Sequence, residues 1–164
     1  MNGQLKVSKS FSFDGEYTGT LKVRFENASA APVEFGYGVL VGSGVSARHS
    51  IDAQYIEANF FSVRDDRRDL KHVKENRAGK HVTSETPVEW AAVKDRHFSV
   101  ILKPAKDAGF TGLVRGLGTN DFSASLVSPK LTVPAGSALE QEFLLYIGPN
   151  EIELRLKIPD GFRD

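Results

Sequence analysis

Apolar residues recur at every second position through the first forty residues of the chain, and this period constrains the fold more than any other feature. The residues concerned are Leu5, Val7, Phe11, Phe13, Leu21, Val23, Phe25, Phe35, Tyr37, Val39 and Val41. Because successive side chains of a β-strand point to opposite faces, the pattern predicts strands with one buried face. Turn-forming residues at Asp14 and Gly15 and in residues 27–32 separate the runs, so we expect an antiparallel meander.

Strand-like runs continue toward the C-terminus. They cover residues 88–93, 98–102, 110–117, 122–127 and 139–147, and Pro or Gly separates the runs from residue 103 onward. No apolar stripe of helical period persists before residue 148, which argues against βαβ units. Short strands at such regular spacing are typical of a sandwich. The sequence therefore predicts one all-β domain over residues 1–164, and Trp90, which shares its parity with Val88 and Ala92, is predicted to lie in the core.

Two segments depart from the regular pattern. Residues 51–63 change parity between Tyr55 and Ile56, which a β-bulge would accommodate, so we interpret them as one bent strand. Residues 64–81 read RDDRRDLKHVKENRAGKH, with seven Lys or Arg against four Asp or Glu. The near absence of apolar residues predicts a long solvated loop there.

The C-terminal residues fit two structures. Residues 152–158 alternate apolar and polar as in a strand, whereas Asn150 followed by Glu153 resembles a helix-opening capping box. Pro159 ends either element. We favour a short C-terminal helix.

Composition restricts the functional classes. The chain has 21 basic and 21 acidic residues, so its formal net charge is zero and no long-range field favours nucleic acid. It contains no Cys, which excludes disulfides, thiolate catalysis and cysteine metal sites. No apolar run approaches the roughly 18 residues that span a bilayer. We expect a soluble domain that does not bind nucleic acid.

Titratable residues form no recognisable catalytic or metal-binding motif. The histidines are His49, His72, His81 and His97, and none has the spacing of a zinc site. Carboxylates able to form a glycosidase pair are too numerous to single out, namely Glu57, Asp65, Asp66, Glu85, Glu89 and Asp95. The glycines at positions 109, 112, 116 and 118 lack GxGxxG order and precede a strand. We therefore expect no catalytic, cofactor-binding or metal-binding residue.

Strand edges offer a route to binding instead. An open sandwich leaves backbone N–H and C=O groups unpaired at its edges, and these can accept an extended peptide by strand addition. We expect the first strand, around residues 5–13, or another edge to self-associate or to capture such a peptide.

Three stretches together resemble a known family. Residues 25–45, 88–104 and 143–157 read FENASAAPVEFGYGVLVGSGV, VEWAAVKDRHFSVILKP and FLLYIGPNEIELRLK. They look like the Asn-Ser-Pro turn with its Gly-rich corner, the Trp-containing strand pair, and the closing strand with a Tyr-x-Gly-Pro turn of the periplasmic domain of YidC-type membrane protein insertases. The resemblance covers residues 4–163. It departs from the family pattern at Asn150, where Lys is usual, and at His97, where an aromatic residue is usual.

The resemblance implies an antiparallel β-super-sandwich similar to galactose mutarotase, with this chain as the later part of a larger periplasmic domain. It implies a non-catalytic domain that faces the periplasm on the bacterial inner membrane and assists insertion and folding of membrane proteins. The implied partners are accessory proteins of the Sec translocon or extended substrate peptides, with membrane contact only through transmembrane helices outside this chain. A carbohydrate-binding or mutarotase-like sandwich and an immunoglobulin-like adaptor remain the alternatives.

Overall fold

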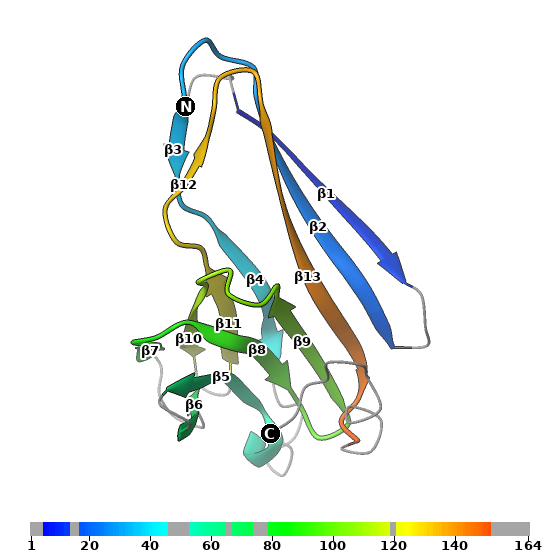
Figure 1. The fold of residues 1–164 in the computed structure, drawn as a ribbon. Helices are drawn as coiled ribbons and strands as arrows, with labels where there is room; N and C mark the ends of the chain where they lie inside the picture. Colours follow the sequence, from blue (N-terminus) through cyan, green and yellow to red (C-terminus); the bar gives the residue numbers. More distant parts are fainter. Residues whose placement is uncertain are drawn as a thin grey trace.

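The computed structural model describes residues 5–13, 17–45, 53–64, 67–73, 79–118 and 121–151, and it is built from antiparallel strands (Figure 1). The strands are β1 (Leu5–Phe13), β2 (Thr18–Asn27), β3 (Val33–Phe35), β4 (Gly38–Val45), β5 (Glu57–Arg64), β6 (Arg67–Val73), β7 (His81–Thr83), β8 (Val88–Lys94), β9 (Phe98–Pro104), β10 (Thr111–Gly118), β11 (Asp121–Val127), β12 (Leu131–Val133) and β13 (Ala138–Pro149). A 3-10 helix, η1 (Ala53–Tyr55), precedes β5. The all-β prediction is confirmed, whereas the helix expected after Asn150 lies outside the described residues. None of the described helices could cross a membrane.

The strands form two main sheets and a small ribbon. One sheet has seven strands in the order β1-β2-β13-β9-β8-β5-β6, and the other has four in the order β4-β11-β10-β7. Strands β12 and β3 form the ribbon, at the end of the molecule where β2 passes into β3 (Figure 1). The predicted meander is wrong beyond its first hairpin, because β2 pairs with β1 and β13 while β3 pairs with β12.

A buried asparagine redirects the chain from β2 to the ribbon. Asn27 is 2% exposed, and its Nδ2 lies 2.8, 3.0 and 3.1 Å from the carbonyl oxygens of Ala31, Val133 and Pro134. Its Oδ1 accepts hydrogen bonds from the backbone N–H and the hydroxyl of Ser29 at 2.9 and 2.6 Å. The predicted turn over residues 27–32 is therefore present, and it is fixed to the segment that joins β12 to β13.

The main core lies between the two sheets and extends under the ribbon. Its aromatic part is a chain of ring contacts in which Phe25 packs against Phe35 and Tyr37 at centroid distances of 4.7 and 4.8 Å, and Phe110 packs against Tyr37 and Phe143 at 5.8 and 5.2 Å. The hydroxyl of Tyr37 is buried, and no described residue forms a hydrogen bond with it. Burial raises the pKa of this phenol well above its ordinary value, because the charged phenolate would lose its hydration.

A second buried cluster covers the opposite face of the seven-stranded sheet and contains Trp90. The indole is 7% exposed and stacks on Phe61 at a centroid distance of 5.6 Å, which confirms the predicted burial. Val88, however, belongs to the main core. The register shifts between Phe61↔Trp90 and Ser62↔Val88, so Glu89 is an extra residue that turns Val88 to the other face.

The prediction of one bent strand over residues 51–63 is wrong. The 3-10 helix η1 occupies Ala53–Tyr55, and β5 begins only at Glu57.

Two further predictions are corrected. Part of the loop expected over residues 64–81 is strand β6, which pairs with β5 from Arg64↔Arg67 to Ala58↔Val73. Strand β6 is held in the sheet by backbone pairing with β5, and this pairing does not require apolar residues at alternate positions of β6. The turn expected at Tyr146 to Pro149 is instead the end of β13, which stays paired with β9 as far as Pro149↔Phe98. The Tyr146 hydroxyl donates a hydrogen bond to the Pro149 carbonyl at 2.7 Å, which secures this strand end.

Candidate interaction surface

Strand β1 is the longest regular edge in the described part of the fold. It pairs with β2 over nine consecutive residues without a register shift, and none of the other described strands pairs with its outer side (Figure 1). By contrast, β4, an edge of the smaller sheet, pairs with β11 through two register shifts, and β7 has three residues. A long, flat edge is the best template for an additional strand, because its free N–H and C=O groups lie in line.

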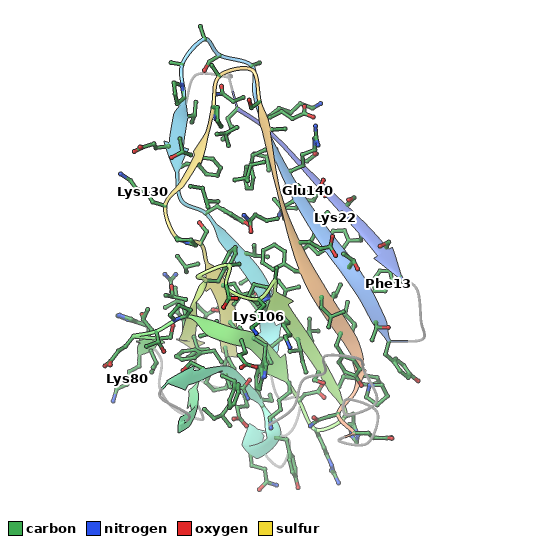
Figure 2. The ribbon with its side chains drawn as sticks, in the orientation of Figure 1. Phe13, Lys22, Lys80, Lys106, Lys130 and Glu140 are labelled. Atoms are coloured by element: carbon green, nitrogen blue, oxygen red, sulfur yellow. The ribbon has the colours of Figure 1, made fainter. Side chains whose placement is uncertain are left out.

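An apolar stripe runs along this edge. Directly opposed residues of an antiparallel pair share a face, and Val7, Phe11 and Phe13 lie opposite Phe25, Leu21 and Gly19 of β2. The stripe therefore continues the face with which β2 contributes to the main core. Yet Val7, Phe11 and Phe13 are 51%, 59% and 58% exposed, and Phe13 stands at the outer end of β1 (Figure 2).

The stripe is exposed because the covering layer ends at β2. Phe35 and Tyr37 cover Phe25, and Phe110 covers Phe143 of β13. In β1, only Leu5 packs against the main core, and every following residue of the strand is exposed. The sheet is thus one strand wider than the layer above it, which leaves three large apolar side chains facing solvent.

The opposite face of β1, with residues 22–26 of β2 and 138–142 of β13, carries charged side chains that pair with one another. Lys6 lies 3.1 Å from Glu26, and Lys22 lies 3.1 Å from Glu142 and 3.6 Å from Glu140. Figure 2 labels Lys22 on β2 and Glu140 on the neighbouring β13. Hydrogen bonds from Arg24 and Lys6 lower the pKa of Glu26. The hydrogen bond to Glu142, together with the attraction of that carboxylate, raises the pKa of Lys22. These pairs are exposed, so they add little stability.

The two edges of the seven-stranded sheet differ in composition. The sequence of β6 is RRDLKHV, with four charged residues and one His, whereas β1 is LKVSKSFSF, with two Lys and no acid. Charged residues on an edge discourage pairing with other chains. Strand β1 lacks most of this protection, so it is the edge that is open to another strand.

The titratable residues singled out from the sequence do not converge. His81 and His97 are exposed, as are Glu85 and Glu89. Glu57 is buried, but it forms an ion pair with Lys94 at 3.2 Å. The carboxylate of Asp95 accepts hydrogen bonds from the backbone N–H groups of His97 and Phe98, which is a turn-forming role.

The side chains of the remaining titratable residues singled out from the sequence are not described by the structure. His49, Asp65 and Asp66 lie outside the described residues, and His72 is described only as part of the β6 backbone. Among the residues whose positions are given, no three His, Asp or Glu side chains are grouped so as to hold a metal ion.

Comparison with known proteins gives a family and a fold. A sequence model of the YidC periplasmic domain matches residues 1–163. No curated protein matches the chain. Among solved structures, a candidate aldose 1-epimerase from Escherichia coli K12 superposes with a TM-score of 0.61 at 12% identity, over 88% of this chain and 60% of its own.

Two other solved structures agree with this fold. A galactose mutarotase-like protein from Lactobacillus casei ATCC 334 superposes with a TM-score of 0.61 at 8% identity, over 87% of this chain and 63% of its own. The Slr1438 protein from Synechocystis sp. PCC 6803 gives 0.57 at 10% identity, over 88% and 55%. These likenesses confirm the galactose-mutarotase-like fold, and the chain spans less than two thirds of each of these proteins.

Proposed function

The chain belongs to the YidC periplasmic domain family, and from that premise we propose that it is a non-catalytic interaction domain of an inner-membrane protein insertase. In this role it faces the periplasm and assists insertion and folding of membrane proteins. It does so by holding accessory proteins of the Sec translocon or extended segments of the inserting polypeptide. The observation that supports a binding role is the open edge of β1 with its exposed apolar stripe.

We further propose that residues 1–164 form one sandwich unit that is the later part of a larger periplasmic domain. The chain covers 60% and 63% of two solved structures that share its fold, so a sandwich of this kind accommodates considerably more polypeptide. Additional polypeptide ahead of residue 1 would join at the Leu5 end of β1. Phe11 and Phe13 lie at the opposite end of the strand, away from that junction.

The non-catalytic part of the proposal is supported by what the carboxylates do. Glu26, Glu57 and Glu142 are engaged with Lys6, Lys94 and Lys22, and Asp95 holds a turn. Carboxylates engaged in this way have structural roles. The likeness to an aldose 1-epimerase at 12% identity concerns the fold and does not transfer its activity to this chain. We expect aldose mutarotation in the presence of the chain to proceed at the rate in buffer alone.

Hydrogen exchange tests the binding role. When a peptide with alternating apolar and polar residues is added, the amides of β1 should exchange more slowly, because strand addition gives its outward N–H groups acceptors. The amides of β6, at the charged edge of the same sheet, serve as the internal control and should be unaffected. Unchanged exchange in β1 at saturating peptide would refute the proposal.

A further inference from the structure

A single lysine interrupts the apolar stripe of β1 at its midpoint. Lys9 lies opposite Val23 of β2, so its side chain leaves the sheet on the same face as Val7 and Phe11. It forms no ion pair within the described part of the chain. Lys6, which leaves on the other face, is held by Glu26 at 3.1 Å. The strand therefore presents one unneutralised ammonium group between two patches of exposed apolar surface.

A strand added to this edge would place one residue directly opposite Lys9. Cross-strand neighbours in an antiparallel pair have Cβ atoms roughly 4.5–5.5 Å apart, which brings a carboxylate on the added strand within reach of the ammonium group. Because Lys9 is the middle residue of Leu5–Phe13, a segment centred on β1 meets it with its own central residue in either direction.

A second copy of β1 cannot supply that carboxylate. The residues on the apolar face are Leu5, Val7, Lys9, Phe11 and Phe13. Every register that keeps two such faces together sets Lys9 against an apolar side chain or against the Lys9 of the other copy. Pairing of two β1 strands thus leaves the positive charge of Lys9 without an acidic partner or places two lysines opposite each other. Like charges that lie directly opposite each other destabilise a strand pair.

We infer that the β1 edge selects an extended segment of another polypeptide in which large apolar residues alternate with polar ones and an acidic residue lies opposite Lys9. This inference rests on the proposed function and adds a preference for the charge of the bound segment. Apolar residues two positions before and after the acid would extend the stripe beside Val7 and Phe11. The acid would neutralise Lys9, so the segment is recognised by pattern and charge together.

The test uses the full chain and three synthetic peptides of nine residues, the length of β1. Each is acetylated and amidated, alternates Val or Phe with Ser, and carries Glu, Gln or Lys at its centre. Titration followed by hydrogen exchange of β1 should show the Glu peptide binding about two- to fivefold more tightly than the Gln peptide, and the Lys peptide more weakly than both. The Lys9→Glu variant should reverse this order.

Lys6→Gln is the matched control, since it removes a positive charge from the same strand but from the opposite face, and it should leave the order unchanged. Equal binding of all three peptides would overturn the charge preference while leaving strand capture intact. No protection by any peptide would overturn both. If the β1 amides become protected as the protein concentration rises without peptide, a second copy of the chain is the occupant. If they are protected in the intact insertase without any partner, a strand of the same polypeptide is the occupant. Either result overturns the inference.

Discussion

Replacing Trp90 with Ala is expected to lower the free energy of unfolding by about 3–5 kcal/mol, because a large cavity would open in the second buried cluster. The indole is 7% exposed, stacks on Phe61 and lies in one cluster with Ile101 and Tyr146. Guanidinium unfolding followed by circular dichroism measures the loss. Since Trp90 is the sole Trp, its native emission should also be blue-shifted.

Trp90→Phe is the informative control for that experiment. The indole Nε1 is buried and has no hydrogen-bond partner among the described residues, so Phe keeps part of the apolar contact and removes this donor. We expect this variant to lose less stability than Trp90→Ala, because the cavity left by Phe is smaller than the cavity left by Ala. A Trp90→Ala variant as stable as the native chain, or native emission typical of indole in water, would show that the second cluster is not packed as described.

Replacing Asn27 with Ala is expected to cost about 2–4 kcal/mol, because removing one partner leaves buried polar groups unsatisfied at roughly 1–3 kcal/mol each. The amide of Asn27 contacts three carbonyl oxygens and holds Ser29 through its Oδ1. Loss of these contacts frees the β2–β3 turn from the segment before β13. Urea unfolding gives the free-energy change.

Asn150→Ala provides a comparison within the same chain. Within the described part of the chain, the side chain of Asn150 makes one long hydrogen bond, 3.3 Å from its Nδ2 to the carbonyl oxygen of Asp95, and the residue is partly exposed. Its replacement should cost less than about 1 kcal/mol, consistent with the modest net worth of one hydrogen bond. Similar losses for both variants would mean that the Asn27 network is not a specific anchor.

Alternation in the sequence predicts the strands that are buried on one face. Strands β1 and β2 were found by their period of two, because each has one apolar and one polar row. The buried face expected from that period is confirmed for β2 and is wrong for β1, where Val7, Phe11 and Phe13 are exposed. The period fails where burial differs. Residues 90–93 of β8 are buried on both faces, and β6 lies at an edge and carries charges, so neither shows the half-buried pattern.

Pairings between distant segments were beyond a reading of the sequence. Strand β2 pairs with β13 from Thr18↔Tyr146 to Glu26↔Ala138. The residue pattern of each strand indicates a strand but does not indicate which other strand it pairs with. The candidate surface was predicted in part. Residues 5–13 or another edge were expected to be open, and the pairing of Lys9 with Val23, which places Lys9 on the apolar face, is a feature of the structure alone.

The exposed stripe supports the proposed binding role by a physical argument. A strand whose backbone is open on one side and whose apolar face lacks a covering layer gains stability from an added strand in two ways. Backbone groups acquire partners, and apolar area leaves water. Both gains are independent of any reactive side chain.

The claim that β1 holds polypeptide is tested most directly by site-specific photocrosslinking in the intact insertase during insertion of one defined membrane protein. A photoreactive residue replaces Phe11 on β1 in one variant and Leu70 on β6 in the other, both of which are exposed, at 59% and 48%. Adducts with the inserting protein at Phe11 and none at Leu70 are the predicted result. Equal labelling at the two edges, or no adduct at Phe11, would contradict the account.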